Sequence, residues 1–97
     1  MTVKTRQRLR LRGEMAEEHP TIWIGKKGVT PELIEEVSKQ LDQNEIVKVR
    51  MLKSTLQTGK RGVIARLTAE KTGAELVEVR GNTFVVYRRR RPREKPL

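Results

Sequence analysis

The chain lacks the residues on which many enzymes and metal sites depend. Its 97 residues include no cysteine and a single histidine, His19. Without cysteine it can form neither a disulfide framework nor a thiolate metal site. His19 stands beside Pro20 at the expected end of a helix, and a structural or solvated role suits it better than catalysis. The composition therefore predicts no metal site.

Long apolar runs are also absent. The longest uncharged apolar stretches, residues 21–24 and 83–87, have four or five residues, whereas a membrane-spanning helix needs roughly 20. No apolar segment of the kind found in a signal peptide follows the basic residues at the start of the chain. We therefore expect a cytoplasmic protein without a membrane partner.

Aromatic side chains are few, namely Trp23, Phe84 and Tyr87. Proteins that stack single-stranded bases present several aromatic rings on one face, so no stacking platform is expected here. We expect Trp23 and Phe84 to lie in the core, and the sequence leaves the place of Tyr87 open.

No constellation that could carry catalysis is visible. The run Thr58-Gly59-Lys60-Arg61 is similar to part of a phosphate-binding P-loop. However, the upstream glycine is missing, and Arg61 stands where a serine or threonine should bind magnesium. The acids are scattered over expected helix surfaces, where solvation is their ordinary role. The sequence predicts a protein that is not an enzyme and has no cofactor and no small-molecule substrate.

The formal net charge of +10 is concentrated at the two ends of the chain. Residues 1–12 carry five bases and no acid, residues 88–97 carry six bases and one acid, and the 11 bases of residues 13–87 are balanced by 11 acids. Thirteen of the 22 bases are arginine, whose planar guanidinium suits phosphate better than an ammonium does. The pattern favours a polyanionic partner, with nucleic acid ahead of an anionic membrane, over tails that only keep the protein soluble.

Turn and capping signals divide the chain into seven elements within one domain, residues 1–97. Its core spans about residues 9–88, between a basic N-terminal segment, 1–12, and an arginine-rich tail, 88–97. Helices are expected near residues 5–18, 31–41 and 60–72, and strands near 21–24, 46–51, 75–80 and 83–88. The order α-β-α-β-α-β-β predicts an α+β fold with two layers, in which helices pack against a four-stranded mixed sheet.

Periodicity assigns a buried face to several of these elements. In the strand at 46–51, Val47, Val49 and Met51 share one face, and Lys48 and Arg50 share the other. The helices are expected to bury two stripes: Leu33, Ile34, Val37 and Leu41 in one, and Val63, Ile64 and Leu67 in the other. Thr30 and Pro31 suit the N-cap and the first position of the middle helix, and Gly73 suits the C-cap of the last.

Two short basic loops begin and end with glycine. Gly25-Lys26-Lys27-Gly28 joins a strand to the well-capped helix at Pro31, so backbone amides, lysines and helix dipole would all favour a phosphate there. Gly59-Lys60-Arg61-Gly62 enters a helix with weaker start signals and places Gly62 inside its first turns. We expect RNA contact from the first loop, whereas the second is as readily a simple turn.

The predicted RNA contacts come from these loops, from one sheet face and from both termini. They are Arg8, Arg12, Gly25, Lys26, Lys27, Gly28, Thr30, Lys48, Arg50, Lys60, Arg61, Arg88, Arg89, Arg90 and Arg91.

Two motifs in the right order resemble those of a known family. One is the loop at 25–30, preceded by Ile22 and Ile24 and followed by Pro-Glu-Leu-Ile; the other is residues 72–77 followed by Gly81 and residues 83–88. Over about residues 9–92 the chain resembles the CRM domain (chloroplast RNA splicing and ribosome maturation), also called the YhbY family. The resemblance implies a fold similar to the C-terminal domain of translation initiation factor three, and an RNA-binding module whose G-x-x-G loop touches RNA.

A single copy with little else around it resembles the family members that associate with precursors of the large ribosomal subunit. The resemblance thus implies a protein that binds ribosomal RNA during ribosome assembly, and we expect it to be a monomer. Two alternatives remain open. One is an RNA chaperone or intron-splicing factor, as in multi-copy plant members, and the other is a structural ribosomal protein.

Overall fold

The computed structural model describes residues 10, 13 and 18–89, and the following statements concern these residues. The expected helix near residues 5–18 lies almost wholly outside them, as do Arg8, Arg12, Arg90 and Arg91. Seven elements follow in order: β1 (Ile22–Ile24), α2 (Pro31–Asn44), β2 (Ile46–Met51), the 3₁₀ helix η1 (Lys53–Gln57), α3 (Arg61–Thr72), β3 (Glu75–Arg80) and β4 (Thr83–Tyr87).

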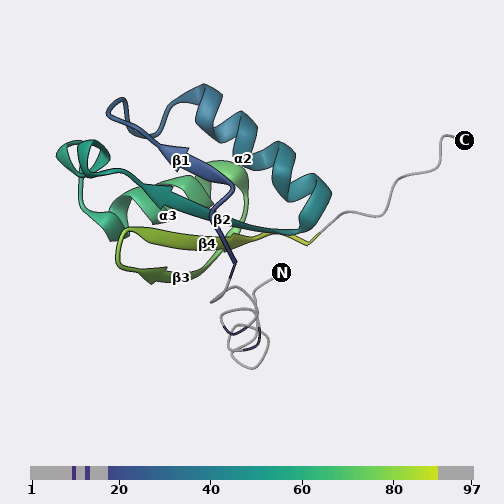
Figure 1. Ribbon diagram of the computed structural model, residues 1–97. Coiled ribbons are helices and arrows are strands. Elements are labelled where there is room, and N and C mark those ends of the chain that lie inside the picture. The colour runs from purple at the N-terminus through teal and green to yellow at the C-terminus, as the bar shows by residue number, and fades with distance from the viewer. Residues whose placement is uncertain (1–9, 11–12, 14–17, 90–97) are drawn as a thin grey trace, which may run out of the picture.

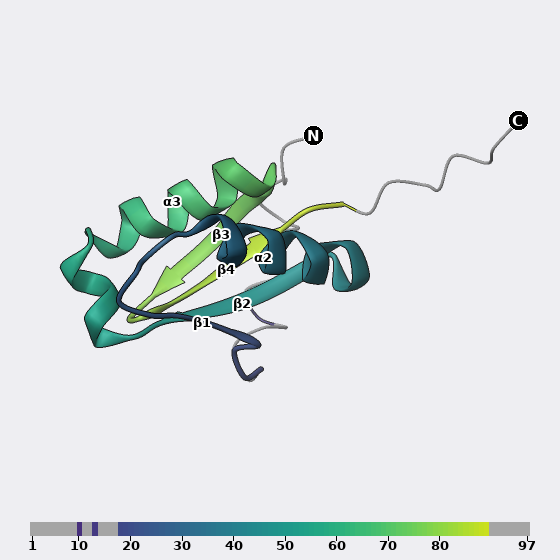
Figure 2. The same cartoon turned by 90° about the horizontal axis from the view of Figure 1, so that it is seen from above.

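The four strands form one mixed sheet in the order β1-β2-β4-β3. β1 is parallel to β2, while β4 is antiparallel to both β2 and β3. Helices α2 and α3 lie together on one face of this sheet (Figures 1 and 2). The predicted α+β class and four-stranded mixed sheet are therefore confirmed. The element that the sequence did not predict is η1, in what had looked like a polar connection.

Local capping explains the bounds of α2. The Thr30 hydroxyl accepts a hydrogen bond from the backbone N–H of Leu33 at 3.1 Å, and Pro31 occupies the first turn. At the other end Glu45 adopts a left-handed conformation, with φ of 63°, and its N–H bonds to the Leu41 carbonyl. Val37 and Leu41 are fully buried, whereas Leu33 and Ile34 are half-buried.

The main core lies between the sheet and the two helices. Strand β2 contributes Val47, Val49 and Met51, all buried, and β4 contributes Phe84 and Val86. The predicted alternation of β2 and the core position of Phe84 are thus confirmed. Val77 follows Leu76 on β3 and points to the opposite face, where a smaller cluster is formed by Val77, Val85, Ile46 and Tyr87. A β-bulge between Leu76 and Glu78 then shifts the register, so that Glu78 rather than Val77 pairs with Val85.

Trp23 was expected in the core, and that expectation is wrong. Its neighbours Ile22 and Ile24 are buried under the helices, and the alternation of strand side chains turns Trp23 to the opposite face of the sheet. There its side chain is 56% exposed.

The predicted buried stripe of α3 is also largely wrong. Val63 is 57% and Leu67 36% exposed, and only Ile64 of the predicted residues is buried. The buried face is instead made by Ile64, Ala65, Thr68, Ala69 and Thr72. Small side chains let the helix lie close to the sheet, and the buried hydroxyls of Thr68 and Thr72 donate to carbonyls one turn earlier, both at 2.8 Å.

Candidate nucleic-acid interface

The loop Gly25–Gly28 is a tight turn between β1 and α2. The N–H of Gly28 donates to the Gly25 carbonyl at 3.0 Å, and Gly28 has φ of 69°. Such a positive φ suits glycine because it has no Cβ. The turn leaves Lys26 and Lys27 exposed at its tip, while Gly28 is buried. The two lysines are thus presented to solvent by a backbone that is held in place.

Gly28 packs directly against η1 and the residue that follows it. A Cβ built on Gly28 would lie 2.9 Å from Oγ1 of Thr58 and 3.3 Å from its Cβ. The glycine was expected to let a phosphate approach, but its missing side chain would point into the protein. Gly25 differs, because an added Cβ there meets no atom within 4 Å. Close approach of a ligand to the backbone is therefore possible at Gly25 rather than at Gly28.

Thr55, a fully buried residue of η1, fixes the start of this loop. Its hydroxyl lies against two carbonyl oxygens, those of Ile24 and of Gly25, the latter at 3.0 Å. The N–H of Leu52 also donates to the Ile24 carbonyl, at 3.1 Å. The sequence alone did not single out Thr55. A threonine between a serine and a leucine is a weak signal, since the carbonyls that it contacts are about 30 positions away.

The second glycine loop, residues 59–62, lies beside the first because it follows Thr58 directly. Both loops are found at the same end of the sheet in two perpendicular views (Figures 1 and 2). Lys60 is the N-cap of α3 and makes no side-chain capping bond. Gly62 lies inside the first turn of the helix, as predicted, where it is the second residue. A depression at this point is lined by residues 56–62.

Exposed cations gather at this end of the sheet, which we call the glycine-loop end. They are Lys26, Lys27, Lys53, Lys60 and Arg61, with the acid Glu32 in the first turn of α2. The Nε atom of Arg61 donates to Oδ1 of Asn82 at 2.7 Å, which ties the second loop to the β3–β4 turn. The N-termini of α2 and α3 add partial positive charge to the same surface. The arrangement can hold a chain of anionic groups.

Three further predicted contacts lie near this end or on the open sheet face. Thr30 uses its hydroxyl oxygen as the α2 cap. Lys48 lies on the face opposite the helices, and its Nζ donates to the Glu18 carbonyl at 2.9 Å. Arg50 lies on the same face, exposed, beside the glycine-loop end.

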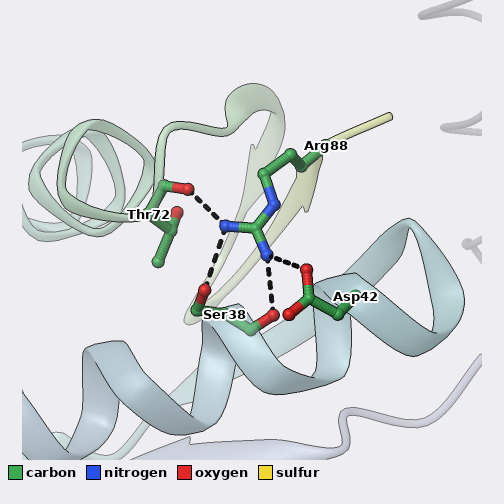
Figure 3. A network of polar contacts seen from close by, with 4 residues as sticks. All are labelled: Ser38, Asp42, Thr72 and Arg88. Atoms are coloured by element: carbon green, nitrogen blue, oxygen red, sulfur yellow. Dashed lines mark hydrogen bonds and ion pairs between the residues drawn. The ribbon is translucent and has the colours of Figure 1, made fainter. Parts of the chain in front are cut away.

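Arg88, also predicted to contact RNA, is instead bound within the protein (Figure 3). Its Nη1 donates to the Thr72 carbonyl at 2.6 Å and to the Ser38 hydroxyl at 3.0 Å. Its Nη2 donates to the Ser38 carbonyl at 2.7 Å and to Asp42 at 2.8 Å. Thr72 is the last residue of α3, so Arg88 also places a positive charge at the C-terminus of that helix. Four of the five N–H donors of the guanidinium are therefore used within the protein, where they join the residue after β4 to both helices.

Neither a metal cluster nor a membrane helix is found in residues 10, 13 and 18–89. No group of three or more histidine, cysteine or acidic side chains in that part could hold a metal ion. No helix there is both long and apolar enough to cross a bilayer.

Comparison with known proteins identifies the family. The model of the CRS1/YhbY (CRM) domain matches residues 3–88. The chain belongs to the CRS1/YhbY (CRM) domain family. The resemblance first noted in the loop and in the C-terminal motif is thereby confirmed.

Several relatives in this family carry names that refer to RNA. A probable RNA-binding protein of Methanocaldococcus jannaschii is 33% identical over 97% of this chain, which spans 66% of that protein's length. An RNA-binding protein of Haemophilus influenzae is 26% identical over 90% of this chain and 86% of its own length. A probable RNA-binding protein of Bacillus subtilis is 26% identical over 86% of this chain and 84% of its own length.

A solved structure shares the fold. It is the solution structure of the hypothetical protein SAV1595 from Staphylococcus aureus, with a TM-score of 0.76 and 27% sequence identity. The match covers 98% of this chain and 95% of the other. The architecture described above is thus shared with a protein of known structure.

Proposed function

We propose that this CRM-family protein binds RNA without catalysing a reaction, and that the glycine-loop end is its main contact with the phosphate backbone. The observation that carries the proposal is the pairing of two basic glycine loops through the contact of Gly28 with Thr58. Lys26 and Lys27 then lie on a turn fixed by Thr55, so little ordering is needed when a phosphate binds. The names of the relatives support RNA as the polyanion.

Within this proposal the partner is ribosomal RNA in precursors of the large subunit, bound by a monomer in the cytoplasm. A role as RNA chaperone or splicing factor, or as a structural ribosomal protein, is the alternative. Crosslinking in cells followed by sequencing of the bound RNA separates these roles. Ribosomal RNA should dominate, and the protein should be found with precursors rather than at full stoichiometry in mature subunits.

The salt dependence of binding tests the electrostatic part of the proposal. Each phosphate neutralised by a lysine or arginine makes log affinity fall more steeply with log salt. Deleting residues 90–97 removes Arg90, Arg91, Arg93 and Lys95 but keeps Arg88 and its hydrogen bonds. We expect a flatter slope for the truncated chain. An unchanged slope would show that the tail does not contact RNA.

The absence of catalysis is tested directly. Purified protein should neither hydrolyse nucleotides nor cut or modify RNA. An activity that co-purifies with the protein and is lost when one of its residues is changed would refute a purely binding role.

A further inference from the structure

Four residues form a row across the open face of the sheet, at the glycine-loop end. Trp23 of β1 is the register partner of Arg50 in β2, Arg50 is the partner of Thr83 in β4, and Thr83 is the partner of Arg80 in β3. Paired residues in neighbouring strands lie about 5 Å apart and point to the same face. This face is the one opposite α2 and α3, because the neighbours of Trp23 on β1 are buried beneath those helices.

The row begins with an indole ring that the fold leaves in solvent. Trp23 is 56% exposed and precedes Gly25, the first residue of the loop, by two positions. Burying this ring under the helices would have given a large hydrophobic gain. Single exposed apolar residues are common, and what sets Trp23 apart is its position beside Arg50 on the sheet face and two residues before the first loop.

The charges beside the ring favour a nucleic acid over an apolar partner. Arg50, directly beside Trp23, is exposed, and its side chain has no hydrogen-bond or ion-pair partner among the described residues. Arg80 at the other end of the row is 65% exposed and pairs with Glu78 at 3.2 Å. Lys26 and Lys27 follow on the adjoining loop. An aromatic face flanked by cations at strand spacing suits a base with its phosphates.

We infer that Trp23 stacks on one unpaired nucleobase of the bound RNA, while Arg50 contacts the phosphate next to that base. The inference rests on the proposed RNA-binding function and adds a recognition element to it. The phosphate backbone lies along the glycine-loop end, and the nucleotide beside the loop turns its base onto the sheet face. A single stacking site would then favour RNA in which a helix adjoins an unpaired nucleotide over fully paired RNA.

The experiment uses the full chain and three probes. The first is an RNA hairpin with a short single-stranded adenosine extension, the second is the same hairpin without the extension, and the third is inorganic polyphosphate. Because Trp23 is the single tryptophan of the chain, its fluorescence reports stacking directly. Affinity is measured in parallel, so that binding and stacking are recorded separately.

We expect all three probes to bind and only the extended hairpin to quench Trp23 strongly at saturation. The extended hairpin should bind about tenfold more tightly than the blunt one, the size of one base–aromatic stack. Trp23→Ala should abolish this preference, and Trp23→Phe should keep part of it. Lys26→Ala with Lys27→Ala should weaken binding of both hairpins alike and leave the quenching at saturation unchanged.

Equal affinity for the two hairpins, or a preference that survives in Trp23→Ala, would overturn the inference while RNA binding itself stands. Quenching by polyphosphate would also overturn it, because that probe has no base. Failure of both hairpins to bind would instead refute the proposed RNA-binding function. The stacking inference, which depends on that function, would then be refuted as well. Because Trp23 is exposed, thermal melting of the alanine variant should stay close to that of the parent.

Discussion

Basic residues lie at both ends of the sheet, but their surroundings differ. At the glycine-loop end, Lys26 and Lys27 stand exposed on an anchored turn. At the opposite end, Arg88 donates four hydrogen bonds to α2 and α3. The same type of charge is thus exposed to solvent at one end and bound within the fold at the other. A count of basic residues therefore does not separate exposed side chains from those bound within the fold, whereas the hydrogen bonds of each side chain do.

The glycines of the two loops differ in the same way. Gly28 has a positive φ and would place a Cβ 2.9 Å from Thr58, whereas Gly62 is helical and has open space around it. Their sequence contexts, G-K-K-G and G-K-R-G, are nearly identical. Only the first motif therefore requires glycine at its last position.

The largest effect is expected from Gly28→Ala. The new side chain must adopt a left-handed conformation and also displace Thr58, and together these should lower the free energy of unfolding by about 2–4 kcal/mol. Urea denaturation measures the loss. In a Thr58→Ala background the cost should be smaller, since part of the clash is gone. A full-size cost in that background would show that the backbone conformation alone requires glycine.

Arg88→Ala should be nearly as damaging to stability. The substitution leaves the carbonyl of Thr72 without a partner at the end of α3, and it removes a charged donor from the partly buried atoms of Ser38. Together these losses should lower the free energy of unfolding by about 2–3 kcal/mol. Asp42→Asn is the matched control: the Asp42 side chain is 74% exposed, so losing the ion pair alone should cost at most about 0.5 kcal/mol. The Arg88→Ala variant could instead melt like the parent and show a smaller slope of log affinity against log salt. Arg88 would then serve RNA binding rather than the fold, and the proposed difference between the two ends of the sheet would be wrong.

Replacing Lys26 and Lys27 together by alanine should affect RNA and not stability. Two phosphate contacts are lost, so the slope of log affinity against log salt should fall by about two, with melting nearly unchanged. Lys39→Ala with Lys71→Ala removes the same charge from exposed positions on α2 and α3 and serves as the control. Equal losses from both pairs would mean that net charge, rather than the loop, governs binding.

A negative charge at Gly25 sharpens the same comparison. Because a Cβ there meets nothing within 4 Å, Gly25→Asp should fold normally and repel a phosphate at the backbone of the loop, giving an affinity loss of about tenfold. Melting and RNA titration are measured on the same sample. Parent-like affinity in the folded variant would exclude close approach of RNA at this residue.

The smallest effect is expected at Gly62. Alanine has a better helix propensity and finds open space, so Gly62→Ala should stabilise the protein by about 0.5 kcal/mol. RNA affinity should stay within about twofold of the parent value, a difference of less than 0.5 kcal/mol. A clear loss of affinity in this more stable variant would place the backbone of the second loop in contact with RNA.

The sequence by itself determined where most elements begin and end, because those signals are local. Thr30 and Pro31 start α2, Gly73 ends α3, and residues 81–82 join β3 to β4, each where predicted. The strict alternation of β2 also assigned its two faces correctly. Each of these features depends on a few neighbouring residues and on backbone conformation.

Only the tertiary structure decided which side chains face the core when the local pattern allowed two answers. Trp23 was placed in the core for its hydrophobicity, but Ile22 and Ile24 occupy the side that the helices cover. In α3, close packing selected alanine and threonine over Val63 and Leu67. Two further contacts are equally non-local. Arg88 donates hydrogen bonds to residues 16 to 50 positions away, and Gly28 packs against Thr58. Such outcomes depend on which elements meet in three dimensions, and short-range propensity does not contain that information.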